Sequence, residues 1–426
     1  MILNSIKKEK ILLSVTFTLI FLRDMQVINV PFIVFSAILF LGAIILSPQA
    51  LCAYVICLVP FCRALPYSEM LLIVLCVTLI KMFQKTKKIH NPILYIFILL
   101  LVAIEVLGYC YWNQFSMEIV YLSVYLIFTT YYISEKLYKN YEIVLVKQYI
   151  ISTLLALLFV IVREINTLGI DYIITYNVRF GANLENIVAT NFNSNEMGLY
   201  AVIAVALALL LFSYTKKVMY VVEALIITLL GMMSISRTFM LMVAIVWIVY
   251  LIKEKINIYF KILIFILVIA TVIIVFKAFP DITEWIQTYF QKRSMQSGGR
   301  SNLLSSYFDL QFSSLYGVIF GYTQMYLNVF KTDTAVHNAI QEMIISWGII
   351  GTIICFCWII MLIVKVIKSC SMGERMSISR WLPIAVFLIY IQAIQFFSQH
   401  NYVIIFLITL VGVTIGGKAR NERSNT

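Results

Sequence analysis

The sequence predicts an all-α, polytopic integral membrane protein with about 14 transmembrane helices and a large helical external loop. Of its 426 residues, 62% are hydrophobic and 12% are charged, whereas a soluble domain is about half apolar and about a quarter charged. Stretches of the length that crosses a bilayer, about 20 apolar residues, recur along the chain, and two connections between them are long. This composition excludes a soluble enzyme, a nucleic-acid-binding module and a secreted disulfide scaffold.

Fourteen apolar stretches are the expected spans: 10–24, 26–47, 49–66, 68–84, 92–112, 117–134, 145–162, 196–214, 218–235, 238–252, 259–277, 339–364, 380–397 and 401–416. Arg23 and Asp24 end the first early, and Pro60 and Arg63 interrupt the third. A lysine cluster precedes the first stretch and no small-residue cleavage site follows it, so we expect an uncleaved span there.

The basic residues of the connections differ between the two sides of the predicted membrane. One side has most of them, chiefly lysine, and includes both termini, while the other side has fewer and chiefly arginine. Because cytoplasmic loops have the lysine and arginine excess, both termini are predicted to be cytoplasmic. Arginine binds phosphate with a planar fork, so its external enrichment indicates an anion site outside. The alternative is that these arginines only snorkel or pair with external acids.

Two long connections, 163–195 and 278–338, are predicted to lie outside and to cap the site of a single membrane domain covering 1–426. Connections of this length are usually functional or disordered. The second is too aromatic for a solvated tail, and its segments 281–293 and 301–312 are predicted to be amphipathic helices at the membrane surface. Aromatic rings among polar side chains suit a sugar, which makes Tyr322 a candidate substrate contact. An interfacial aromatic belt is the alternative.

Candidate functional residues recur on three external segments. The first long connection has Arg179-Phe-Gly181 and Asn191-Phe-Asn193-Ser-Asn195, a short turn has Ser234-Ile-Ser236-Arg237-Thr238, and the second long connection has Gly298-Gly299-Arg300, with His337-Asn338 through Glu342 at its end. His337 and Gln341 share a helix face, as do Asn338 and Glu342, because each pair is four residues apart. Each motif is weak alone, but three arginines and one histidine on the same side form a stronger pattern.

At these residues, over about 179–351, the sequence resembles the bacterial polysaccharide polymerase and O-antigen ligase superfamily, and among its branches the Wzy-type O-antigen or capsule polymerases. The shared features are the external arginine, the Asn-rich start of a span, the Ser-x-Ser-Arg-Thr turn, the Gly-Arg element and the His-Asn pair. The chain departs from an Arg-x10-Gly pattern of some members, because Thr190 and Gln311 stand at the glycine positions.

The resemblance implies a GT-C-like glycosyltransferase on the outer face of the bacterial cytoplasmic (inner) membrane. Its donor would be an undecaprenyl-diphosphate-linked oligosaccharide of lipopolysaccharide or capsule biosynthesis, and its acceptor a second lipid-linked repeat unit. Arg179, Arg237 and Arg300 are expected to stabilise the leaving diphosphate, and His337 to accept the acceptor's proton. Asn193, Asn195, Asn338, Glu342 and Tyr322 are expected to bind substrate.

Direct displacement would invert the anomeric centre, and no metal or cofactor is expected, because the external acids form no Asp-x-Asp motif and arginine can stabilise the charge. By analogy, partners besides the lipid bilayer would be a chain-length regulator and a flippase; no nucleic acid is expected.

Several alternatives stay open. His400-Asn401 repeats the His-Asn pair at another external turn, so His400 competes with His337 as the base. Glu105 and Glu223 lie within spans, where an ionisable residue is either functional or an interhelical hydrogen-bonding residue. At the level of the whole protein, an O-antigen ligase acting on lipid A-core needs the same clamp and base. A lipid-linked oligosaccharide flippase is disfavoured, because no internal repeat is evident.

Overall fold

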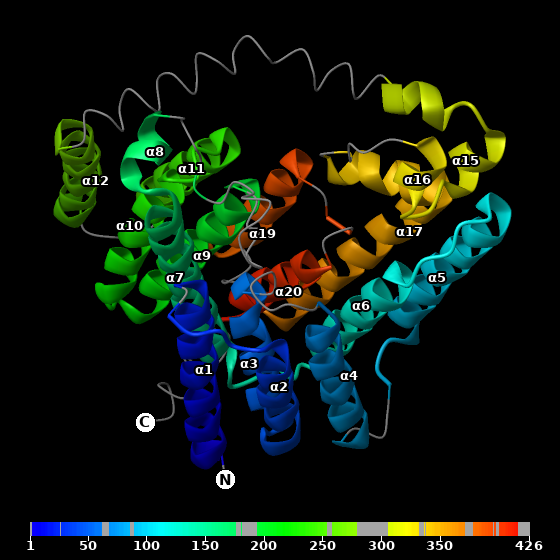
Figure 1. Cartoon of the computed structure of the whole chain (residues 1–426), viewed down its shortest axis with the longest axis horizontal. Coiled ribbons are helices and arrows are strands. Elements are labelled where there is room, and N and C mark those ends of the chain that lie inside the picture. Colours follow the sequence, from blue (N-terminus) through cyan, green and yellow to red (C-terminus); the bar gives the residue numbers. More distant parts are fainter. Residues whose placement is uncertain are drawn as a thin grey trace.

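The computed structural model of the chain consists of helices, and the described residues contain no strand (Figure 1). The structure describes residues 2–25, 27–61, 68–85, 89–175, 180, 194–253, 258–278, 306–331, 336, 338–370, 378–394, 396–397 and 400–415. The all-α prediction is confirmed for this part of the chain.

Each of the expected apolar stretches coincides with a helix. The first group comprises α1 (Ile2–Asp24), α2 (Phe32–Ile45), α3 (Pro48–Leu58) with the 3-10 turn η1 (Val59–Phe61), α4 (Ser68–Lys85), α5 (Pro92–Trp112), α6 (Glu118–Ser134) and α7 (Glu142–Leu168). The second comprises α9 (Ser194–Thr215), α10 (Met219–Met232), α11 (Arg237–Lys253), α12 (Ile258–Ala278), α17 (Ala339–Ser369), α19 (Ile378–Tyr390) with the 3-10 turn η2 (Ile391–Ala393), and α20 (Asn401–Thr414). Shorter helices are α8 (Ile170–Thr175), α15 (Leu315–Phe320) and α16 (Tyr326–Phe330).

Four described helices, α5, α7, α9 and α17, are long and apolar enough to cross a bilayer by length and composition. Shorter apolar helices accompany them, among them α2, α6, α10 and α20. These helices indicate a protein embedded in a membrane.

Helix starts follow local sequence signals. Pro48 and Pro92 stand at the first turns of α3 and α5, where a missing N–H costs no helical hydrogen bond. Ser47 caps α3 by accepting a hydrogen bond from the Ala50 amide. At the end of α2, the Lys81 ammonium donates to the carbonyls of Ile44 and Leu46. These contacts satisfy backbone groups that the helix itself leaves unpaired.

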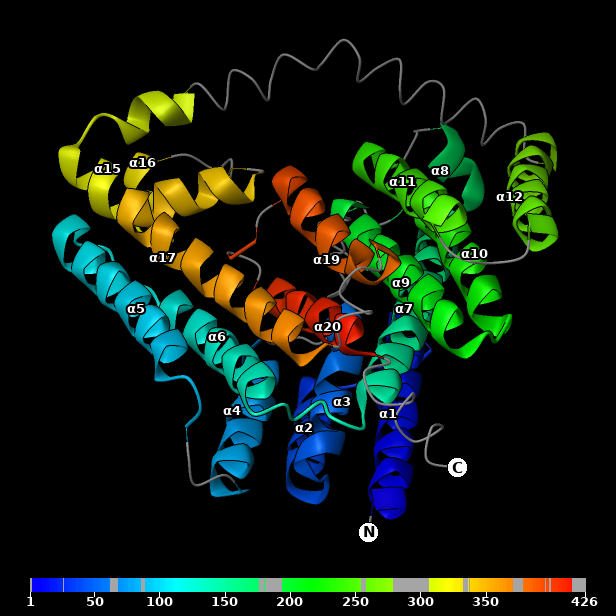
Figure 2. The ribbon, with the colours of Figure 1, turned by 180° about the vertical axis from the view of Figure 1, so that it is seen from behind.

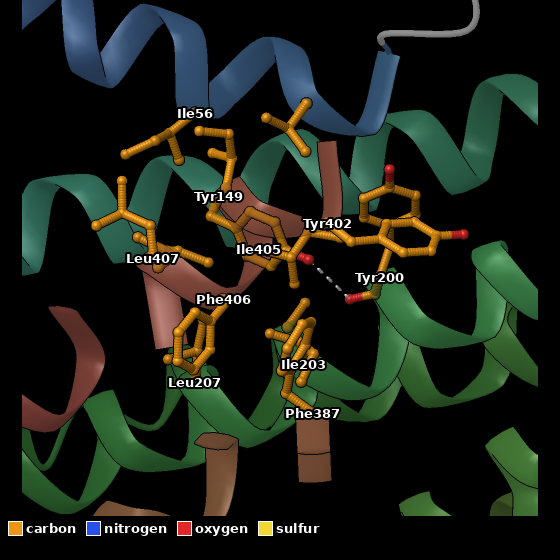
Figure 3. Close-up of a cluster of buried hydrophobic side chains, with 14 of the residues drawn as sticks. Ile56, Tyr149, Tyr200, Ile203, Leu207, Phe387, Tyr402, Ile405, Phe406 and Leu407 are labelled. Atoms are coloured by element: carbon orange, nitrogen blue, oxygen red, sulfur yellow. Dashed lines mark hydrogen bonds between the residues drawn. The ribbon is translucent and has the colours of Figure 1, made fainter. Parts of the chain in front are cut away.

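The centre of the molecule is built on α9 and α20, which are buried on almost every side. Figure 3 shows Ile203 and Leu207 of α9 beside Phe406 of α20 and Phe387 of α19. Tyr149 of α7 donates a hydrogen bond to the carbonyl of Tyr200. A helix that is apolar all round belongs in an interior, so α9 and α20 support the helices that surround them.

Helix α17 is broken near its first third, where Gly348 has φ 61° and ψ −166°. The break frees the carbonyls of Ile345 and Ser346, which accept hydrogen bonds of 2.8 Å from the amides of Tyr322 and Thr323. A Cβ at Gly348 would collide with the Ile319 carbonyl, so the loop and the break fit each other only with glycine there. The helices α15 and α16 consequently lie over α17, beside the end of α5 (Figures 1 and 2).

Two predicted boundaries were wrong. α7 continues to Leu168 instead of ending at 162, because Arg163 and Glu164 are buried together, with 3.5 Å between Arg163 Nη2 and Glu164 Oε1. The stretch 380–397 is helical only to Ala393, for a reason given below. Within the predicted surface helix 301–312, residues 306–311 are helical, whereas 281–293 lies outside the described residues.

Candidate functional site

The structure places some of the predicted site residues and leaves others undescribed. Asn195, Arg237, Tyr322, Asn338 and Glu342 are described. Arg179, Asn193, Arg300 and His337 lie outside the described residues.

Asn195, in the first turn of α9, meets the serine turn that precedes α11. Ser236 Oγ donates to Asn195 Oδ1 at 3.0 Å. Tyr390, the last residue of α19, donates its hydroxyl to the Asn195 carbonyl at 2.9 Å and lies 3.3 Å from Ser236 Oγ. A Cβ at Gly198 would collide with the Tyr390 hydroxyl, so the glycine permits this approach. Two motifs on separate segments of the chain are thereby joined through Tyr390.

The serine turn aims Arg237 outward from the first position of α11. Ser234 Oγ donates to the Gly231 carbonyl at 2.7 Å, and Ser236 Oγ accepts from the Phe239 amide as a helix cap. Between them Ile235 is fully buried with φ 45°, a costly conformation for a β-branched residue. Arg237 is exposed. An arginine at the positive end of a helix is unfavourable by itself, and an anion bound there would be attracted by both charges.

The Asn338 side chain makes two hydrogen bonds. Its Oδ1 accepts from the Gln341 amide at 3.0 Å and so caps α17. Its Nδ2 donates to the Gln392 carbonyl at 3.2 Å, in the turn η2. The residue after His337 is therefore fixed to the end of α19.

Glu342 explains why α19 ends early. Its Oε2 accepts from the amides of Phe396 at 2.6 Å and Phe397 at 3.2 Å, and its side chain is buried. In an unbroken helix the Phe396 amide would donate to the Gln392 carbonyl. Here Asn338 donates to that carbonyl and Glu342 accepts from that amide. The side chains of Asn338 and Glu342 thus take the place of one backbone hydrogen bond and prevent α19 from continuing.

The connection between α19 and α20 (390–400, of which 395, 398 and 399 are not described) ends at His400, the N-cap position of α20. His400 Nε2 lies 3.2 Å from Glu118 Oε2 of α6, without hydrogen-bond geometry. Burial lowers the pKa of His400 to about 4. The next residue, Asn401, donates from Nδ2 to the Tyr200 hydroxyl of α9.

Tyr322 lies apart from this connection, in a cluster with Tyr307, Tyr326 and Trp112. Its ring stacks on Trp112 with 4.7 Å between centroids, and its hydroxyl donates to the Leu310 carbonyl at 2.9 Å. The ring is 2% exposed. Tyr322 therefore packs the external loop, and these contacts do not place it beside the other described candidates.

Glu105, the intramembrane carboxylate of α5, connects helices. Its Oε2 accepts from Trp347 Nε1 at 2.5 Å, and its Oε1 accepts from the Gln324 amide at 2.8 Å. The side chain is fully buried. These bonds fit the interhelical alternative, in which Glu105 ties the external loop to the break in α17.

The connection 390–400 thus contacts the first turn of α9, the serine turn before α11, the start of α17 and α6. It brings Asn195 and Ser236-Arg237 near one end and Asn338 and Glu342 near the middle. No group of three or more metal-ligating side chains occurs in the part of the chain that the structure describes.

Sequence reasoning missed three participants: Tyr390, Gln392 and Glu118. A signal for Gln392 was present, because Gln392 and Gln395 interrupt the stretch 380–397 that was predicted as one apolar span. Polar residues within a span indicate an interior role, and here they accompany the helix break.

Comparison of the chain with protein-family models and with curated proteins found no match.

Proposed function

We propose that this chain is a polysaccharide repeat-unit polymerase of the Wzy type, an O-antigen or capsule polymerase. One observation carries the proposal: the Asn-rich helix start, the Ser-x-Ser-Arg turn and the His-Asn helix start converge on the connection 390–400, although they are far apart in sequence. A purely structural membrane protein has no need to gather these motifs at one place.

The proposed topology has all fourteen apolar helices crossing the bacterial inner membrane in a GT-C-like arrangement. An even number of crossings returns the chain to its starting side, so both termini are cytoplasmic, as the lysine distribution favours. The loops 163–195 and 278–338 then cap the site on the outer face.

The proposed reaction transfers a glycan from undecaprenyl diphosphate to a terminal sugar hydroxyl of another lipid-linked repeat unit. The hydroxyl oxygen attacks the anomeric carbon, the bond from that carbon to the diphosphate oxygen breaks, and the configuration inverts. The electron pair leaves with undecaprenyl diphosphate, whose charge Arg179, Arg237 and Arg300 stabilise. His337 takes the hydroxyl proton.

Asn195 and Asn338 have clear positions in this scheme. Asn195 holds the turn that presents Arg237, and Asn338 fixes the backbone next to His337. Asn193 completes the proposed substrate-binding set. Glu342 acts through the backbone that it holds, and Tyr322 packs the external loop without contacting this connection. A chain-length regulator and a flippase are the proposed partners.

The test uses purified full-length protein in lipid nanodiscs with the undecaprenyl-diphosphate-linked repeat unit as sole substrate and EDTA present. A ladder of lengths on a gel is expected. Arg179→Ala and Arg300→Ala should abolish it without loss of membrane expression, and Arg300→Lys should rescue poorly, because lysine lacks the bidentate fork. Lys277→Ala, which removes an external cation outside the clamp, is the matched control.

Four outcomes would contradict the proposal or one of its parts. Products only after addition of lipid A-core would identify a ligase, and movement of the substrate across the bilayer without new bonds a flippase. A ladder that needs Mg²⁺ or Mn²⁺ would overturn the metal-independent mechanism. For His337→Ala we expect a loss of about 10²–10⁴-fold in turnover, and a normal rate would remove His337 as the base.

A further inference from the structure

A histidine, a carboxylate and two tyrosines face one another where α20 begins beside α6. Glu118, Tyr121 and Tyr125 are spaced three and four residues apart, so they share one face of α6. The centroid of the His400 ring lies 6.1 Å from that of Tyr121 and 6.0 Å from that of Tyr125, with 29° between the planes of the last pair. Nothing in the proposed transfer step uses this group.

The polar atoms of this group are arranged for a further partner. His400 Nε2 is buried without a hydrogen-bond partner, although Glu118 Oε2 is 3.2 Å away. The Glu118 side chain is 46% exposed, so its carboxylate can accept hydrogen bonds from a bound molecule. A neutral imidazole has one donor and one acceptor nitrogen, and a carboxylate offers several lone pairs. The imidazole is neutral near pH 7, because its pKa is lowered by burial.

A second histidine–carboxylate pair shows what a closed arrangement looks like. At the other end of α6, Glu135 accepts from the His90 amide at 3.1 Å and from His90 Nδ1 at 2.6 Å. In that pair the carboxylate and the imidazole are hydrogen-bonded to each other, and the second bond, from the His90 amide, fixes the backbone just before α5. His400 Nε2 makes no such hydrogen bond to Glu118. The pair therefore does not cap a helix in the way that His90 and Glu135 do.

The local charge selects against a phosphate. Glu69, at the start of α4, is near enough to interact electrostatically with Glu118, so two carboxylates face this place. Arg237 lies near the other end of the connection, where Tyr390 meets the serine turn. A diphosphate is attracted to the arginine end, and hydroxyl groups, which donate hydrogen bonds, suit the carboxylate end.

We propose that His400 and Glu118 form a subsite that binds hydroxyl groups of the acceptor glycan, with the half-buried Tyr121 beside the apolar face of the sugar ring and the buried Tyr125 supporting the His400 ring. The inference rests on the proposed function, because it assigns the acceptor to one end of the connection 390–400 and the donor diphosphate to the other. It gives His400 a binding role and leaves proton transfer to His337.

Binding is tested first, without turnover. The chain has three histidines, so full-length protein labelled with ¹³C at histidine Cε1 gives three resolvable signals in nanodiscs. The probe is the repeat-unit oligosaccharide on a neutral alkyl chain, which accepts but has no diphosphate to donate. The His400 signal should shift with saturable dependence on the probe, while His90 should not. An unshifted His400 signal at saturating probe concentration would overturn the subsite.

Kinetics with the same acceptor then separate binding from chemistry. His400→Gln and Glu118→Gln should raise the acceptor KM by about 10- to 100-fold, the range for one hydrogen bond to a charged or buried group, with kcat and donor KM nearly unchanged. Glu135→Gln is the matched control and should change none of them. An equal fall in kcat for both variants, with an unchanged acceptor KM, would contradict a binding role.

Failure of the proposed function looks different. A saturable His400 shift in protein that forms no glycosidic bond would leave the saccharide subsite standing and remove the polymerase. A polymerising protein whose His400 signal ignores the acceptor would remove the subsite alone. Because the labelled protein carries no substitution, this distinction does not depend on the folding of a variant.

Discussion

Replacing Glu342 by alanine is expected to close or disorder the break at the end of α19. The carboxylate is 2% exposed, and its Oε2 accepts from the Phe396 and Phe397 amides at 2.6 and 3.2 Å. Alanine removes the acceptor from both amides at once. The helical partner of the Phe396 amide would be the Gln392 carbonyl, which already accepts from Asn338.

The magnitude follows from these bonds. A buried donor left without an acceptor costs about 1–3 kcal/mol, so two amides cost about 2–6 kcal/mol. With 1.4 kcal/mol for each factor of ten, local opening becomes about 30- to 10⁴-fold more frequent. Glutamine is expected to cost about ten-fold, because both bonds use one oxygen, which the amide carbonyl can replace while only the charge is lost.

Amide hydrogen exchange measured by mass spectrometry on peptides covering 390–400 checks this. Glu105→Ala is the matched control: it removes another buried carboxylate that accepts a backbone amide, so exchange should rise at Gln324 and stay unchanged at Phe396. Equal exchange at 396–397 in the wild type and in Glu342→Ala would refute the reasoning, and so would a glutamine variant as open as the alanine one.

Further substitutions test other parts of the structure. Gly321→Ala and Gly348→Ala should reduce folded yield severely, because both glycines have positive φ and a Cβ would meet backbone. Gly169→Ala, with φ 79°, ψ 147° and open space, should cost only the backbone strain of about 1–3 kcal/mol in thermal unfolding. His400 has its pKa lowered from 6.5 to about 4 in the folded state, so the stability present above pH 6.5 should fall by up to about 3 kcal/mol as the pH drops toward 4; His400→Gln should flatten this part of a stability–pH curve, and an unchanged curve would contradict a buried neutral imidazole. Arg237→Ala should abolish polymer while Arg237→Lys retains a little, as measured by product ladders; full activity of the alanine variant would remove Arg237 from the clamp.

The apolar stretches were sufficient to locate the helices. Helix formation in such a chain depends on local hydrogen bonds and on runs of apolar side chains, both of which are written in consecutive residues. The expected stretches 49–66 and 339–364 begin within one residue of α3 and α17, where Pro48 stands in the first turn and Asn338 is the N-cap. Topology, donor and reaction class stay predictions, because they depend on charge distribution and on resemblance.

What the tertiary structure decided is the pairing of polar groups over long separations. Glu105 was ambiguous in the sequence, and its meaning came from Trp347, 242 residues away. The break in α19 depends on Glu342, which is 54 residues from Phe396. A buried polar group must find a partner wherever the fold provides one, and no local pattern encodes a partner contributed by another helix. For the same reason the sequence does not indicate that Glu118 lies beside His400, because the packing of α20 against α6 brings the two together.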